Sequence, residues 1–171
     1  EYQGQPLTKL ALKLIALTFV RTGELIGARW DEIELNAGLW RIPAERMKMR
    51  TPHIVPLSNQ AIVVVGEIKK YSLHSEFLFP GEQNPKKSMS NNTILYALYR
   101  MGYHSRMTGH GFRGLASTIL HEQGYGHHLI ELQLAHTERN AVSASYNHAI
   151  YLEPRREMMQ AWADYLDSLI N

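Results

Sequence analysis

The stretch from His110 to Tyr146 holds four side chains whose types suit phosphate chemistry. His110 and Arg113 stand three apart in TGHGFRGLAST, His136 ends the run LAH, and Tyr146 lies in SASYNHA. A guanidinium donates two hydrogen bonds to a phosphate and keeps its charge, while an imidazole exchanges a proton near neutral pH. A phenol has a pKa of about 10 and needs nearby cations to act as a nucleophile. The stretch predicts a site that binds a phosphate and makes a tyrosyl bond.

Two positions upstream would supply further cations to this site. Arg21 follows an apolar run, and Glu24 stands three residues later, so the two can meet across one helical turn. Lys48 lies at the tip of a basic turn, where a lysine can protonate a leaving oxygen. Each residue has an ordinary alternative: a helix-end ion pair, a solvated cation that touches DNA backbone, a capping histidine or a packed tyrosine. Taken singly, these alternatives stay open.

Hydrophobic periodicity and turn residues indicate the elements that must position these side chains. We expect a mainly α fold with a small antiparallel β-sheet (α+β), formed by residues 1–171 as a single domain. We expect Gly23 to break the first helix. The expected caps of later helices are Ser58, either Asn91 or Asn92, and Asn140. Pro6 is expected in the first turn of the first helix, and Gly124 is expected to end the helix 109–123. The predicted helices are 7–19, 24–30, 59–71, 92–102, 109–123, 127–135, 141–151 and 154–170. The predicted strands are 30–35, 39–43 and 53–57.

Composition narrows the classes of function. The chain of 171 residues has 44% apolar residues, no cysteine and a net charge of +2. No run approaches the ~18 apolar residues of a membrane span. Residues 1–113 hold 15 Lys/Arg against 9 Asp/Glu, whereas residues 114–171 hold 3 against 7. This asymmetry favours a basic nucleic-acid face with an acidic docking segment, and an uneven solvated surface remains the alternative. Nine histidines are present, but no zinc-type ligand spacing accompanies them, so we expect no metal and no cofactor.

In order along the chain, these residues resemble the active-site set of the tyrosine recombinases, or phage integrases. The set is Arg21, Lys48, His110, Arg113, His136 and Tyr146. The sequences around these residues also resemble the motifs of the family. The short sequences HGFR, LAH and YNHA are most similar to those of P4-like prophage integrases. Three details depart from the family pattern: LAH replaces the commoner LGH, Gly114 stands where many members have histidine, and ten residues separate His136 from Tyr146.

The resemblance implies site-specific DNA recombination, in phage or prophage integration and excision, through a 3′-phosphotyrosyl intermediate. Tyr146 would attack the phosphodiester, Arg21 and Arg113 would bind its non-bridging oxygens, and Lys48 would protonate the leaving 5′-oxygen. His136 would add a hydrogen bond to the phosphate, His110 would assist proton transfer, and Glu24 would support the first arginine. Three alternatives remain: a type IB topoisomerase-like strand transferase, a non-catalytic DNA-binding module, and a metal-dependent nuclease.

The implied partners are double-stranded DNA attachment sites, other integrase protomers in a tetramer on DNA, and accessory DNA-bending or directionality proteins. We expect no association with a membrane. The implied location is the cytoplasm of a bacterial host. We expect the chain to be the catalytic domain of a longer integrase, without its N-terminal arm-binding and core-binding domains. The last helix, with Met158, Met159 and Trp162, is expected either to pack on its own domain or to dock on a neighbouring protomer.

Overall fold

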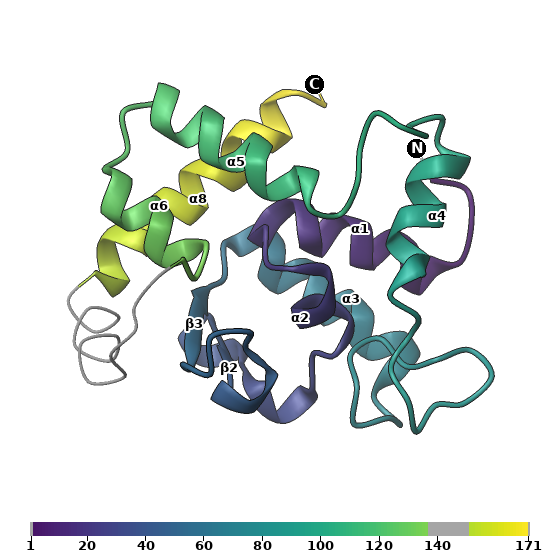
Figure 1. The fold of residues 1–171 in the computed structure, drawn as a ribbon. Coiled ribbons are helices and arrows are strands. Elements are labelled where there is room, and N and C mark those ends of the chain that lie inside the picture. The colour runs from purple at the N-terminus through teal and green to yellow at the C-terminus, as the bar shows by residue number, and fades with distance from the viewer. Residues whose placement is uncertain (1, 137–150, 171) are drawn as a thin grey trace.

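The structure, a computed structural model, describes residues 2–136 and 151–170 (Figure 1). Its three strands form one antiparallel sheet in the order β1-β2-β3, and the other elements are helices and short 3-10 turns. This arrangement confirms the predicted class. The elements are α1 (Pro6–Thr18), α2 (Thr22–Ile26), η1 (Trp30–Glu32), β1 (Ile33–Glu34), η2 (Leu35–Ala37), β2 (Leu39–Ile42), η3 (Ala44–Arg46), β3 (His53–Pro56), α3 (Asn59–Ser72), α4 (Asn92–Arg100), α5 (Gly111–Glu122), α6 (His127–Gln133) and α8 (Leu152–Ser168).

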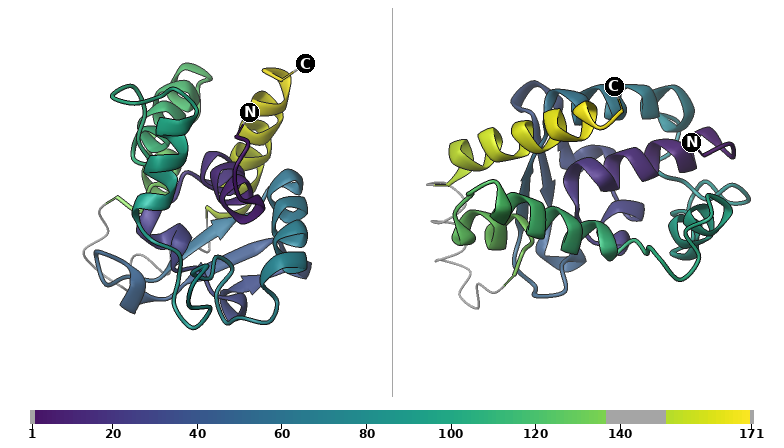
Figure 2. Two further views of the ribbon diagram at one scale, coloured as in Figure 1. Left: turned by 90° about the vertical axis from the view of Figure 1, so that its right-hand side faces the viewer. Right: turned by 90° about the horizontal axis from the view of Figure 1, so that it is seen from above.

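Helix α1 runs through the middle of the molecule and contacts α2, α3, α4 and α8 (Figures 1 and 2). Its apolar residues Ala11, Leu14 and Ile15 are fully buried, as the helical spacing predicts. Pro6 occupies the first turn, where its missing N–H leaves no helical hydrogen bond unmade. The helix therefore serves as the support on which the other elements are arranged.

The chain turns sharply between α1 and α2, and the turn separates two hydrophobic cores. Phe19 adopts the left-handed conformation (φ 40°) and enters a core built with α5, α6 and α8, whereas Val20 enters the core beneath the sheet and α3. The expectation that Gly23 breaks the helix is wrong, because Gly23 lies inside α2 and Arg21 is the residue before its first turn. The break falls earlier because two adjacent apolar residues are buried in different cores.

Most other boundaries agree with the sequence within two or three residues. Ser58 caps α3 by accepting a hydrogen bond from the Ala61 N–H at 3.2 Å, and Gly124 ends α5 with a φ of 85°. At α4, Asn91 makes no capping bond, and Ser90 Oγ instead accepts from the Asn92 N–H at 3.3 Å. The predicted helix 141–151, its cap Asn140 and the nucleophile Tyr146 lie outside the described residues.

Helix α8 packs on its own domain. Met158, Met159 and Trp162 are buried against Phe19, α5 and α6. The Trp162 ring meets Phe19 edge-on at 6.0 Å between centroids, and its Nε1–H donates to the Ala16 carbonyl at 2.9 Å. Of the two arrangements that the sequence left open, the structure shows self-packing for this helix.

Candidate active site

Arg21 is held by the ion pair that its spacing predicts. Its Nη1 lies 2.8 Å from Oε1 of Glu24, and its backbone N–H donates to Oε2 of the same carboxylate at 2.9 Å. Glu24 is buried, whereas the side chain of Arg21 keeps 26% of its surface exposed. Because the carboxylate binds both the backbone and the guanidinium of Arg21, it fixes the direction of the guanidinium and leaves Nη2 to make another contact.

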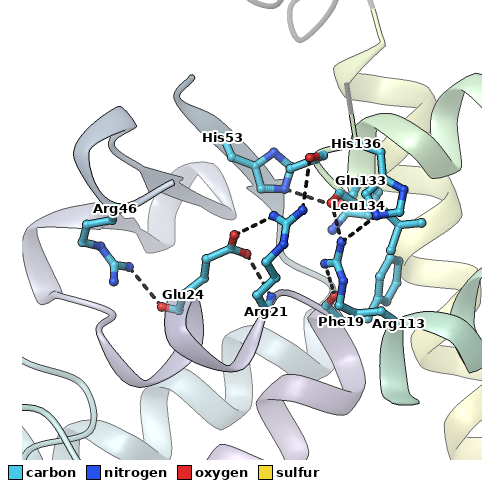
Figure 3. Close-up of polar contacts among 10 residues, drawn as sticks. Phe19, Arg21, Glu24, Arg46, His53, Arg113, Gln133, Leu134 and His136 are labelled. Carbon is cyan, nitrogen blue, oxygen red and sulfur yellow. Dashed lines mark hydrogen bonds and ion pairs between the residues drawn. The ribbon is translucent and has the colours of Figure 1, made fainter. Parts of the chain in front are cut away.

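Arg113 lies in the first turn of α5 and is only 3% exposed. Its Nη1 donates to the Phe19 carbonyl at 2.9 Å, and its Nη2 donates to the Leu134 carbonyl at 2.5 Å (Figure 3). Burial and, next, the positive charge of Arg21 lower the pKa of Arg113 to about 10, and Glu24 and Glu131 partly oppose this shift. An anion bound between the two arginines would offset both causes.

The two arginines meet at the end of α6. The helix closes with paired hydrogen bonds, from the His136 N–H to the Glu131 carbonyl and from the Ala135 N–H to the Leu132 carbonyl, which form a Schellman motif. The next three carbonyls have no partner within the helix, and they lie at its partly negative end.

Each of these three carbonyls accepts from a side chain of a different element (Figure 3). His53 Nε2 of β3 lies 3.1 Å from the Gln133 carbonyl, Arg113 donates to Leu134, and Arg21 Nη2 makes a longer contact of 3.4 Å with Ala135. We call Gln133, Leu134 and Ala135 the carbonyl triplet. Because neighbouring carbonyls receive Arg21 and Arg113, the two guanidinium groups lie close together at the end of α6.

His136 directly follows the carbonyl triplet. Its Nε2 lies 3.3 Å from Arg113 Nη2, and its Nδ1 lies 3.2 Å from Oε2 of Glu131. With Arg113 as the donor, Nε2 accepts and the Nδ1–H donates to the carboxylate. An oxygen placed beside Arg113 would therefore also lie beside the His136 ring.

Ala135 adopts the left-handed conformation with a φ of 49°. A Cβ at such a position costs roughly 1–2 kcal/mol, which explains why glycine suits this helix end. Ala135→Gly should therefore raise the free energy of unfolding by about 0.5–1 kcal/mol, since glycine's larger unfolded-state entropy offsets part of the gain. Urea denaturation measures the change. Ala116→Gly inside α5 is the matched control and should lower the free energy of unfolding. If Ala135→Gly lowered it by a similar amount, the idea that the left-handed Ala135 is strained would be wrong.

Lys48 lies on the exposed loop between β2 and β3, beside an open depression that it shares with Arg21, Glu24 and Arg50. Its neighbour Arg46 in the same basic turn points inward. Arg46 Nε lies 2.7 Å from Oε1 of the buried Glu32, and its Nη2 donates to the Glu24 carbonyl at 3.1 Å. Lys48 thus lies at the depression that Arg21 borders, and the contacts of Arg46 with Glu32 and Glu24 fix the loop to the rest of the domain.

The other predicted residues are placed less fully. His110 is the exposed residue before the first turn of α5, and its side chain makes no hydrogen bond with the described residues. Tyr146 lies outside the described residues. Among residues 2–136 and 151–170, no group of three or more His, Asp or Glu side chains could hold a metal ion. No helix in that same part of the chain is both long and apolar enough to span a membrane.

Sequence analysis missed His53, Gln133 and Arg155, which form a buried polar group behind the site. Arg155 is fully buried in α8, and its Nη2 donates to the Ile54 carbonyl at 2.6 Å and to Gln133 Oε1 at 2.7 Å. Burial lowers the pKa of Arg155 to about 9. The acceptors lie 101 and 22 residues from Arg155 in sequence, so no local spacing indicates these contacts.

Comparison of sequences identifies relatives of this chain. The model of the phage integrase family matches residues 4–153. The integrase of Enterobacteria phage P4 is 47% identical over 97% of this chain and 42% of its own length, and the Escherichia coli K12 prophage integrase IntZ is 44% identical over 99% and 42%. The chain spans less than half the length of these curated relatives.

Solved structures share the fold at low sequence identity. The integrase from mycobacterium phage Brujita aligns with a TM-score of 0.69 at 16% identity, over 92% of this chain and 52% of that one. A lambda integrase tetramer bound to a Holliday junction aligns with a TM-score of 0.60 at 17% identity, over 80% and 43%. By its sequence this chain belongs to the phage integrase family, and its fold is that of the tyrosine recombinase catalytic domain.

Proposed function

We propose that this chain is the catalytic domain of an integrase that cleaves and rejoins DNA during phage or prophage integration and excision. One observation carries the proposal. Arg21 and Arg113 rest on adjacent carbonyls of the same helix end, and Lys48 and Arg21 border the same depression. Two guanidinium forks with one lysine beside them suit a phosphodiester, whose two non-bridging oxygens share one negative charge and which releases one bridging oxygen.

In the proposed reaction, Tyr146 attacks the phosphorus and forms a 3′-phosphotyrosyl bond while the 5′-oxygen leaves. Arg21 and Arg113 bind the non-bridging oxygens, where negative charge builds up in the transition state. His136 adds a hydrogen bond to one of them, and Lys48 gives a proton to the leaving oxygen. His110 assists the loss of the tyrosine proton. The phosphotyrosine conserves the bond energy, so a second strand's 5′-hydroxyl can reverse the attack.

The partners of the solved relatives guide the rest of the proposal. Lambda integrase has been solved as a tetramer on a Holliday junction and as a dimer on a core site. We propose that this chain likewise acts on double-stranded attachment sites with other protomers, as part of a longer integrase in a bacterial cytoplasm. Arm-binding and core-binding domains and accessory DNA-bending or directionality proteins belong to the same proposal.

The test is covalent capture of a nicked attachment-site DNA in EDTA. The protein should form an SDS-stable adduct without any divalent cation. Lys48→Ala should slow cleavage by about 10²-fold or more, the usual contribution of a positioned general acid. A 5′-bridging phosphorothiolate should restore most of that rate, because a thiol has a pKa of about 8.5 and leaves without a proton.

Two results would count against this function. A requirement for a divalent cation would favour a metal-dependent nuclease over phosphotyrosine chemistry. Equal slowing of Lys48→Ala on the oxygen and sulfur substrates would remove Lys48 from the role of acid. Arg41→Ala is the control for lost charge, because Arg41 also lies on the hairpin but pairs with Glu34 on its exposed face.

A further inference from the structure

His53 occupies a position that the proposed reaction does not use. It is the first residue of β3, pairs across the hairpin with Ile42, and is only 2% exposed. Its Nε2 lies 3.1 Å from the Gln133 carbonyl, the first of the carbonyl triplet. Since a carbonyl can only accept, the Nε2–H is the donor. This hydrogen bond joins β3 to the helix end that holds the two arginines.

The loop that carries Lys48 leaves the sheet after Ile42 and returns to it at His53. Before Lys48, the loop is fastened by Arg46 on Glu32 and by the buried side chain of Met47. After Lys48, residues 49–52 are exposed or half-buried, and His53 is the next buried residue. His53 is thus the attachment point for the second end of the lysine loop.

The acceptor of that bond is itself fixed in place. The Gln133 side chain donates to the Thr18 carbonyl at 3.4 Å and accepts from Arg155 at 2.7 Å. The following two carbonyls carry Arg113 and Arg21. Loss of the His53 donor should therefore leave the helix end in place, and β3 stays tied to Gln133 through Arg155 and the Ile54 carbonyl. The change should loosen the lysine loop, because His53 is the first buried residue after Lys48.

We propose that His53 is a positioning residue for Lys48. Its hydrogen bond to the Gln133 carbonyl sets the lysine loop against the same helix end that orients Arg21 and Arg113. The Lys48 Nζ is thereby kept at the leaving oxygen of the phosphate that the arginines bind. The proposal rests on the proposed function. A misplacement of about 1 Å can cost 10²-fold in rate, so a single buried hydrogen bond is enough to control proton transfer.

The test compares His53→Leu with His53→Gln on the oxygen and the 5′-bridging phosphorothiolate substrates. Leucine removes the donor, whereas the glutamine amide nitrogen reaches about as far as Nε2 and can donate. His53→Leu should slow cleavage of the oxygen substrate by about 10–10²-fold. On the phosphorothiolate, which needs no acid, it should come within about threefold of the unchanged protein. His53→Gln should stay near the unchanged rate on both.

A purely structural role for His53 would predict a different pattern. Slowing of His53→Leu by the same factor on both substrates, with DNA binding and thermal unfolding unchanged, would overturn the proposal. If His53→Leu does not fold, His53→Phe keeps a ring without the donor, and the same comparison decides. The unchanged protein and Lys48→Ala are measured in the same experiment. If the unchanged protein forms no adduct, or if the phosphorothiolate does not restore the rate of Lys48→Ala, the proposed function is rejected. If both of these controls behave as expected but the phosphorothiolate does not restore the rate of His53→Leu, only the present inference is rejected.

Discussion

Arg113→Ala is expected to slow DNA strand cleavage by about 10³-fold, the scale associated with losing a preorganised donor or an arginine at a transferring phosphate. Arg113 is fixed by the carbonyls of Phe19 and Leu134, and burial and, next, the charge of Arg21 lower its pKa. A phosphate oxygen bound there meets a donor that needs no reorientation. Single-turnover cleavage of a nicked substrate measures the loss.

The control for this change must separate chemistry from folding. Arg113→Ala leaves two carbonyls without their donor, each worth about 1–3 kcal/mol if it stays unsatisfied, so thermal unfolding is measured in parallel. Arg156 is a matched comparison, because it also donates to two carbonyls, those of Ala37 and Gly38, at a turn away from the carbonyl triplet. Arg156→Ala should cleave within about threefold of the unchanged protein. Similar cleavage by folded Arg113→Ala would contradict the phosphate role.

Tyr146→Phe is expected to abolish the SDS-stable adduct with DNA altogether. The change removes one oxygen, and without that oxygen no phosphotyrosyl bond can form at this position. The phenyl ring remains, and only one hydroxyl is lost, so DNA binding should change by no more than about 0.5 kcal/mol. Gel analysis after SDS treatment measures the adduct, and a mobility shift measures binding.

The other tyrosines provide the comparison, since the chain has nine. Tyr151 lies five residues downstream, and its ring contacts His128 at 4.8 Å between centroids. Tyr151→Phe should form the adduct at the normal rate. An adduct that persists in Tyr146→Phe and disappears in Tyr151→Phe would transfer the role of nucleophile to Tyr151.

Local chemistry was enough to predict much of the fold and part of the site. The cap at Ser58, the left-handed Gly124 and the Arg21–Glu24 pair follow from residues within a few positions of one another, and all three are confirmed. The break assigned to Gly23 is wrong because tertiary burial of Phe19 and Val20 in separate cores outweighed the low helix propensity of glycine.

The rest of the site depends on contacts between distant parts of the chain. His53 binds a carbonyl 80 residues later, and Arg113 binds one 94 residues earlier. A backbone carbonyl exists at every position, so the sequence gives no sign of which ones will receive a side chain. The pairing of Arg46 with Glu32 is equally hidden from the sequence, since it depends on how η3 folds over α2.

The carbonyl triplet has a consequence for how such a site can be studied. Its acceptors are peptide oxygens, which remain whatever amino acid stands at 134 or 135 as long as α6 ends in the same way. An alanine scan across this helix end would report on side chains such as the buried Leu134 and Gln133 and would leave these oxygens untouched. Replacing a single peptide link with an ester, which weakens its carbonyl as an acceptor, would disturb Arg113 without altering any side chain.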